Sequence, residues 1–418
     1  MNSARRGSTL SRLAARMTKR LELTRNEQRN PGKTRLLMTG RSKGVRMKHP
    51  FFWLMAVTAG LLMHATGVLG AASPNGSLVK AKQAAEAKGY VFHSTHDEII
   101  AQAKKEGKLH VLTSTDRDVL RASADAFKKK YPFINLRCEE VGGTETYQRM
   151  LQEMRTGMAK WDVNYVAFDN YEDYIPYQKK YDLLGMTQQG VLKMIPDLID
   201  PVNRHIVALG GHFQAVAYNK QLVSPERLPG TWDGFLNPEF KDRKIATDIR
   251  SVMFAALVPA WGLERTVAFA RKLSAQNPIW LRGVSRIISS VQTGEVPIGI
   301  GLNGKSILRE QKKDRRGVLG LKIVEPVPAR MSGTEAVLAT AENPHAALLW
   351  LEFQASLQGQ KVLDEADLNA SLLTPGSMQG EMIRGKKVSL LGWEHYREMG
   401  RYQEEVVNAF GFPRADKK

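Results

Sequence analysis

The sequence predicts an α/β protein with two lobes, in which helices cover both faces of a parallel or mixed sheet. Short runs rich in β-branched residues alternate with longer segments of helical period, and this alternation is typical of a sheet flanked by helices. The chain has 418 residues, which exceeds the usual size of one compact domain. We therefore expect the chain to divide into two lobes.

The expected strands are short segments in which β-branched and other apolar residues follow one another. In chain order they are 109–113, 134–137, 163–168, 215–218, 244–247, 296–300, 321–325 and 336–339.

The expected helices lie between these strands and repeat apolar residues at helical spacing. They are 116–130, 144–156, 263–275, 284–292 and 346–357. In the first of them, Val119, Leu120, Ala124 and Phe127 fall on one face. Pro344 precedes the last helix. A proline suits the start of a helix because its fixed φ is close to the helical value, and the N–H group that it lacks would have no partner in the first turn.

The N-terminal part of the chain resembles an export signal. Basic residues up to Lys48 precede an apolar run from Phe51 to Gly70, and small residues follow. This order predicts a signal peptide over 47–72 that begins at Met47 and is cut near Ala72. Residues 1–46 would then be a disordered or wrongly included basic leader, and 73–92 a loosely attached arm. The alternative is an uncleaved membrane anchor, because about twenty apolar residues can span a bilayer.

The net charge excludes some partners. The whole chain carries a formal charge of +19, but most of this surplus lies before residue 73, and about +7 remains beyond it. A positive surplus this small, spread over the chain after residue 72, is typical of an ordinary solvated surface. We therefore expect no nucleic-acid partner. Cys138 is the only cysteine, which leaves no cysteine pair for a disulfide or a zinc site.

Polar residues follow predicted strands at the places where helices begin. They are Thr113, Ser114, Thr115 and Asp116 after the first strand, Gly143 and Thr144 before the second helix, and Asp169 and Asn170 after the third strand. In open α/β sheets, ligands bind beyond the carboxyl ends of strands, where helix N-termini offer free amides. These residues are therefore candidate ligand contacts, although Thr115 and Thr144 could simply cap their helices.

The segment 299–306 matches both the phosphate-loop and the dinucleotide-binding patterns. A nucleotide-binding loop precedes a helix that packs on the sheet, whereas 305–313 holds only two apolar residues and should be mostly solvated. An exported protein would also meet little ATP or nicotinamide cofactor. We therefore expect no cofactor, and expect Asn303, Gly304 and Lys305 to present a backbone turn and a cation to a carboxylate or phosphate.

Signs of catalysis are few, and we expect no enzyme. The sequence contains neither G-x-S-x-G nor H-E-x-x-H, and Cys138 has the setting of an ordinary strand residue. His93, His96 and Asp97 could be read as a metal cluster, but Thr95 with Glu98 better fits the start of a helix. An exported enzyme stays open as an alternative, with Asp116, Glu145 and Asp169 as its acidic candidates.

Several motifs resemble extracellular solute-binding proteins of ABC importers. In order they are Ala103 to Lys108, Ala217 to Lys220, Leu228-Pro229 with Thr231-Trp232, Asn237-Pro238, Phe240-Lys241, and Asn343 to Ala347 leading to Trp350, Glu352, Phe353, Gly359 and Gln360. The resemblance implies the type 2 periplasmic binding fold, in its ferric-iron-binding-like branch, with two crossover hinge strands near 214–217 and 324–327. Lobe one would hold 93–213 and 326–418, and lobe two 214–325.

The resemblance also implies a periplasmic monomer that closes its lobes around a small ligand and delivers it to a permease in the inner membrane. A module that signals to a membrane sensor would look the same in sequence. Tyr218 and Ser251 complete the set of expected ligand contacts. Ferric members of the branch use adjacent tyrosines, but this chain has no Tyr-Tyr pair. Because Lys305 would repel a metal, we expect no metal site and favour an anionic or zwitterionic solute over ferric iron.

Overall fold

The computed structural model describes residues 74–167, 171–250, 252–368 and 370–412. The expected leader 1–46 and signal peptide 47–72 lie outside the described residues, as do Asp169, Asn170 and Ser251. Within the described ranges, no helix is both long enough and apolar enough to cross a membrane.

The described strands form one mixed sheet of ten strands with the order β2-β1-β3-β9-β4-β7-β5-β6, while β10 pairs with β9 and β8 pairs with β4. The strands are β1 (Lys108–Thr113), β2 (Asn135–Glu140), β3 (Val163–Tyr165), β4 (Ile206–Asn219), β5 (Ile245–Asp248), β6 (Ile279–Leu281), β7 (Ile298–Asn303), β8 (Leu319–Lys322), β9 (Val327–Val337) and β10 (Val388–Leu391).

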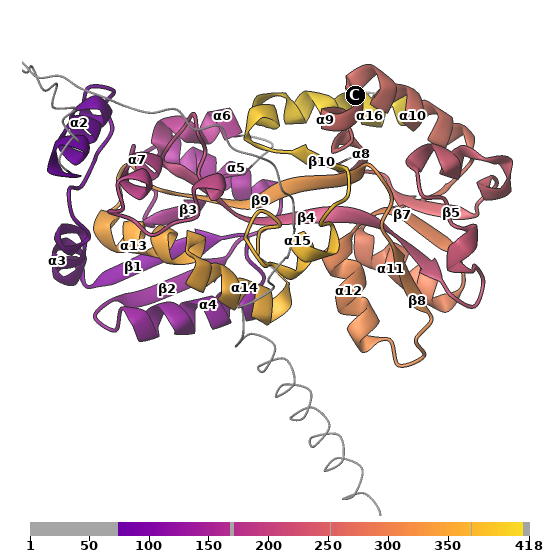
Figure 1. Ribbon diagram of the computed structural model, residues 1–418, viewed down its shortest axis with the longest axis horizontal. Helices are drawn as coiled ribbons and strands as arrows, with labels where there is room; N and C mark the ends of the chain where they lie inside the picture. The colour runs from indigo at the N-terminus through magenta and orange to yellow at the C-terminus, as the bar shows by residue number, and fades with distance from the viewer. Residues whose placement is uncertain (1–73, 168–170, 251, 369, 413–418) are drawn as a thin grey trace, which may run out of the picture. The chain divides into compact units, whose positions relative to one another are not determined.

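Helices cover this sheet on both faces (Figure 1). The α-helices are α2 (Pro74–Glu86), α3 (His96–Glu106), α4 (Arg117–Lys130), α5 (Thr144–Arg155), α6 (Tyr171–Tyr174), α7 (Leu183–Gln188), α8 (Val252–Ala255), α9 (Val258–Trp261), α10 (Leu263–Ala275), α11 (Val284–Thr293), α12 (Gly304–Lys313), α13 (Pro344–Ala355), α14 (Leu357–Asp367), α15 (Met378–Met382) and α16 (Met399–Phe410). Short 3-10 helices are η2 (Ile175–Tyr177), η3 (Pro196–Leu198), η4 (Pro225–Arg227), η5 (Trp232–Leu236), η6 (Pro238–Phe240) and η7 (Trp393–Glu398).

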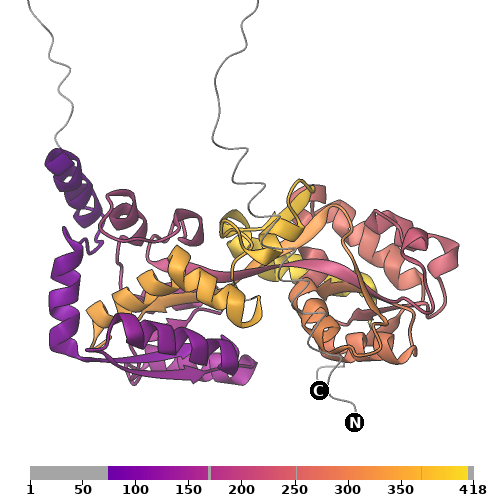
Figure 2. The same cartoon turned by 60° about the horizontal axis from the view of Figure 1, so that its bottom comes forward.

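Strand β4 runs through two parts of the sheet. Its residues up to Phe213 pair with β9, and from Gln214 onward they pair with β7 and β8. We call the part with β1, β2, β3, β9 and β10 the first lobe, and the part with β5 to β8 the second lobe. Figure 2 shows β4 passing from one lobe to the other. The change of partner falls at the expected boundary 213/214, while the full lobe boundaries stay a prediction.

The core of the first lobe is centred on α13. Every residue of this helix from Ala346 to Ala355 is buried, because α3, α14 and the sheet surround it, and a helix enclosed in this way is apolar on all sides. Trp350 packs edge-on against Phe127 of α4, with ring centroids 5.2 Å apart.

The core of the second lobe is rich in aromatic residues, and it includes the last helix of the chain. Phe410 of α16 lies 4.6 Å from Trp280 and 6.3 Å from Phe254, measured between ring centroids. The helix therefore packs on α8 and α10, although the expected range 326–418 assigned it to lobe one. The sequence pattern could not predict this contact, because Phe410 lies far from Trp280 and Phe254 along the chain.

Most of the expected strands and helices are present, but several elements differ. Strand β9 covers Val327–Val337, where only 336–339 was expected, and the helices α14 and α16 were not expected. Strand β4 is far longer than the expected 215–218. Its first half was not predicted because it contains Gly210 and Gly211, and glycine has a low β-propensity. The short strands β6 and β10 were not expected. The expected arm 73–92 contains α2, whose Ala85 is buried in the first-lobe core.

Candidate functional site

Two neighbouring cavities lie where β4 and β9 cross between the lobes. The first-lobe cavity, about 230 Å³, is lined by the loop from Ser114 to Asp116, by Tyr147 and Tyr165, and by Lys305. The second-lobe cavity, about 210 Å³, is lined by Gln214, Asp248, Arg250, Asn303 and Ser306, among others. His212 and Arg330 line both cavities. The two hollows therefore form one candidate binding cleft with these two residues at its centre.

His212 and Arg330 face each other across the crossover strands. His212 of β4 is the register partner of Arg330 of β9, and directly opposed residues of an antiparallel pair project from the same face of the sheet. Among the described residues Arg330 forms no ion pair. Its guanidinium is therefore a cation in the cleft whose charge no described carboxylate balances, which suits a carboxylate or phosphate.

The imidazole of His212 is neutral at physiological pH. Burial lowers its pKa to about 3, and the positive charges of Arg330 and then Lys305 act in the same direction. A neutral imidazole can donate one hydrogen bond and accept another. His212 therefore offers a hydrogen bond to a ligand, while Arg330 supplies the charge.

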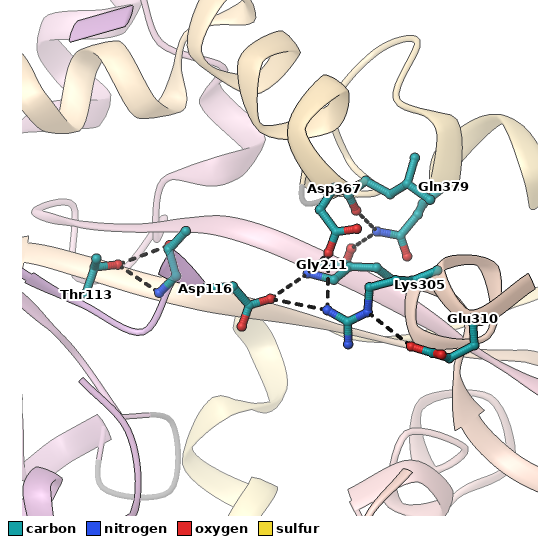
Figure 3. Close-up of polar contacts among 10 residues, drawn as sticks. Thr113, Asp116, Gly211, Lys305, Glu310, Asp367 and Gln379 are labelled. Carbon is teal, nitrogen blue, oxygen red and sulfur yellow. Dashed lines mark hydrogen bonds and ion pairs between the residues drawn. The ribbon is translucent and has the colours of Figure 1, made fainter. Parts of the chain in front are cut away.

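Lys305, the cation that the sequence singled out, lies in the cleft but has carboxylate partners. Its Nζ is 3.3 Å from Oδ2 of Asp116 and 3.5 Å from Oδ2 of Asp367. Arg309, one turn further along α12, reaches the same two oxygens at 3.8 and 3.4 Å. We call these four residues the α12 cluster; Figure 3 shows Asp116 pointing toward Lys305. Because Asp116 and Asp367 belong to the first lobe and α12 to the second, the cluster ties the lobes together.

The loop after β1 is held from behind by a buried carboxyl group. The Thr113 hydroxyl donates to Oε1 of Glu335 at 2.5 Å, and the Thr115 amide donates to the same hydroxyl oxygen at 3.2 Å. Trp350 donates to the second oxygen of Glu335. Burial raises the pKa of Glu335 to about 7, although these two side-chain hydrogen bonds pull it down. Thr113 is thus a support for the cleft loop, since it is itself fully buried.

The alternative interpretation, in which Thr115 and Thr144 cap their helices, is wrong. Asp116 occupies the N-cap of α4 without a side-chain capping bond, and Gly143 occupies the N-cap of α5 with φ +86°. Asp116 is instead paired with Lys305, and glycine tolerates the positive φ that this entry to a helix requires. Thr144 is the first residue of α5, so neither Thr115 nor Thr144 is a cap.

The segment 299–306 is shaped by packing. A Cβ atom on Gly304 would lie 2.5 Å from the ring of Phe213, so a glycine is needed there for the close approach of α12 to β4. The expectation that this helix is mostly solvated is wrong, because Gly304, Lys305 and Ile307 are buried. The helix is amphipathic, and Lys305, which lies on its inner side, belongs to the α12 cluster.

Other expected contacts lie elsewhere. Tyr218 lies in the apolar core of the second lobe and is 6% exposed, and Gly143 does not line either cavity. The sequence reading missed His212, Arg330, Tyr147 and Tyr165. The available signal for Arg330 was a positive charge between Ala329 and Met331, in a short run of otherwise apolar residues, since arginine is mostly found on exposed surfaces.

The groups that suggested catalysis or a metal have structural partners. The Glu98 amide donates to the Thr95 side chain at the N-cap of α3, as expected. His93 is hydrogen bonded to Glu98, and His96 to Glu352. Burial raises the pKa of Cys138 to about 12. Within the described ranges, no three His, Cys, Asp or Glu side chains are grouped as they would be around a metal ion.

Comparisons with known proteins support the fold and identify the family. A comparison with curated proteins gives no match. The chain is similar in structure to iron-bound HitA from Pseudomonas aeruginosa, with 17% identity, a TM-score of 0.54, and coverage of 73% of this chain and 99% of that one. It is similar to apo ferric ion-binding protein A from Pasteurella haemolytica, with 15% identity, a TM-score of 0.58, and coverage of 74% and 100%.

A third similar structure is the periplasmic binding protein AfuA from Actinobacillus pleuropneumoniae, with fructose-6-phosphate bound. It has 17% identity, a TM-score of 0.54, and coverage of 72% of this chain and 97% of that one. These likenesses show the two-lobed type 2 periplasmic binding fold. The model of the family described as bacterial extracellular solute-binding protein matches residues 173–399. Because that match spans more than half of the chain, the protein belongs to the bacterial extracellular solute-binding protein family.

Proposed function

We propose that this protein binds a small anionic solute in the cleft between its lobes and delivers it to the permease of an ABC importer. It would work as a periplasmic monomer, exported through the signal peptide expected over 47–72. Lobe closure around the solute would provide the transport signal, because a ligand shifts a conformational equilibrium only by binding one state more tightly. We assign it no catalytic step and no cofactor.

One observation carries the choice of an anion. Arg330 lies at the centre of the cleft, lines both cavities, and has no ion-pair partner among the described residues. Arg330 is partly buried, and a partly buried cation without a counterion attracts a negative group more strongly than one in bulk water does, so a ligand that carries such a group would bind well here. Lys305 contributes less than the sequence suggested, since Asp116 and Asp367 already balance it.

Ferric iron, free or chelated, is the second candidate. By their titles, one of the similar structures is iron-bound and another is a ferric ion-binding protein. Tyr147 and Tyr165 lie side by side in the first-lobe cavity with ring centroids 4.9 Å apart. Phenolate oxygens suit Fe(III). The nearby Arg330 and Lys305 oppose a bare cation but not an anionic iron chelate.

A thermal-shift panel separates these candidates. The protein is heated with inorganic phosphate, with organic phosphates and carboxylates, and with Fe(III) and ferric citrate. At a ligand concentration one hundred times Kd, binding raises stability by about 2.7 kcal/mol, which is a clear shift. We expect organic anions to stabilise the protein. Stabilisation by the iron compounds and by no organic anion would replace this proposal with the ferric one.

A further inference from the structure

We propose that the second-lobe cavity is a subsite for hydroxyl groups of the solute, read by the side-chain amides of Gln214 and Asn303. This inference rests on the proposed function and narrows it to one class of solute. The solute would carry hydroxyl groups next to the negative group that Arg330 binds.

The two amides form a pair because of strand register. Gln214 of β4 is the register partner of Asn303 of β7, so both side chains project from the same face of the sheet. Both line the second-lobe cavity, next to His212 and Arg330. The pair therefore sits beside the expected anion position, in the other lobe from Ser114 and Thr115.

Both amides lack hydrogen-bond partners in the described part of the chain. Gln214 is 1% exposed, and its Oε1 is buried without a partner. The Oδ1 atom of Asn303 is likewise buried and unbonded. A buried polar group left unpaired costs about 1–3 kcal/mol. A bound ligand that donates hydrogen bonds to these two oxygens would remove this cost.

Other buried glutamines show how a purely structural amide behaves. The amide of Gln360 donates to the carbonyl oxygens of Leu209 and Gln354 and accepts from Ser371 and Thr374. Gln379 also has an unbonded oxygen, but its amide nitrogen donates to two backbone carbonyls, and it lines neither cavity. Gln214 differs because it lines the cleft and makes no bond that would fix its amide.

The chemistry of the cavity selects hydroxyl groups. An amide both donates and accepts, as a hydroxyl does, whereas a phosphate or carboxylate oxygen can only accept. An ammonium group or metal ion could also satisfy the oxygens, but the cavity holds Arg330 and Arg250. The one carboxylate there, Asp248, is occupied by two hydrogen bonds from the Arg250 guanidinium and one from the Gly283 amide. A neutral donor is therefore the best match.

Matched probes that differ only in hydroxyl groups test the subsite. Isothermal titration calorimetry compares glycerol 3-phosphate with propyl phosphate, and glycerate with propionate. In the unaltered protein we expect the hydroxylated member of a pair to bind about tenfold more tightly, which corresponds to about 1.4 kcal/mol. In Gln214→Leu and in Asn303→Leu the gap should shrink to about threefold or less. The exposed Gln221 provides the control, and Gln221→Leu should keep the gap.

Each outcome decides between the alternatives. Equal binding within both pairs, or a gap that survives in both variants, overturns the subsite while leaving the anion proposal in place. If no anion binds at all, the proposed function falls and the subsite falls with it. Circular dichroism and melting curves check each variant. If Gln214→Leu does not fold, the partly exposed Asn303 decides the question alone.

Discussion

The α12 cluster and the His212–Arg330 pair lie in the same cleft but use positive charge in opposite ways. In the cluster, Lys305 and Arg309 face two carboxylates. In the pair, Arg330 faces a neutral imidazole and forms no ion pair among the described residues. The first arrangement holds the lobes in register, and the second is available to a ligand. A cation that lines a cavity is therefore a good candidate for binding an anion only if carboxylates of the protein do not already pair with it.

Removing Arg330 should have the largest effect. In Arg330→Gln we expect the affinity for the best-binding anion to fall about 100-fold, because a hydrogen-bonded charge pair contributes about 1.5–3 kcal/mol. Calorimetry measures the loss, and Arg330→Lys should restore part of it. Arg227→Gln, which removes an exposed arginine of a surface pair, is the control. An affinity unchanged in Arg330→Gln would contradict the contrast drawn above.

The pH dependence of stability should report on His212. Its pKa is lowered from 6.5 to about 3, so its contribution to stability is complete above pH 6.5 and is lost as the pH falls toward 3. At about 1.4 kcal/mol per pH unit, His212 should cost the protein up to about 2 kcal/mol between pH 6.5 and 5.

Urea unfolding of the unaltered protein and of His212→Gln at both pH values measures this difference. His205, whose pKa burial lowers to about 4, changes stability in the same direction and is present in both proteins. It therefore cancels in the comparison. Parallel pH profiles for the two proteins would show that His212 is not held neutral by its surroundings.

Removing Lys305 should weaken the connection between lobes more than it weakens binding. In Lys305→Met we expect stability to fall by about 1 kcal/mol, because Arg309 still reaches both carboxylates and Asp116 is half exposed. Anion affinity should change by about threefold or less. Lys313→Met, on the exposed side of the same helix, should leave both unchanged. A loss of affinity as large as that of Arg330→Gln would show that Lys305 binds the ligand directly.

Salt should give the smallest effect. The side chains of Lys305 and Asp367 are 9% and 23% exposed, and such a partly buried pair is screened far less than an exposed one. Between about 0.05 and 0.5 M NaCl, the stability difference between the unaltered protein and Lys305→Met should therefore shift by less than about 0.5 kcal/mol. Urea unfolding at the two salt concentrations measures it. A difference that disappears in high salt would mean that the α12 cluster is an ordinary surface network.

The fold was more predictable than the site, for a physical reason. Periodicity placed α10 and most of β1 because a helix or strand shows its buried face in its own residues. The value of Lys305 as a ligand depends instead on Asp116 and Asp367, which lie far from it in the sequence. His212 and Arg330 become neighbours only through the pairing of β4 with β9, and no local pattern contains that pairing.

The length of β4 has a consequence for how the protein melts. Its 14 residues pair with β9 in one lobe and with β7 and β8 in the other. Unfolding of either lobe would therefore break backbone hydrogen bonds of this shared strand. We therefore expect a single calorimetric transition for the whole sheet. A solute held only at the crossing would then protect distant parts as well, including the aromatic core around Phe254 and Phe410, from heat and from proteases.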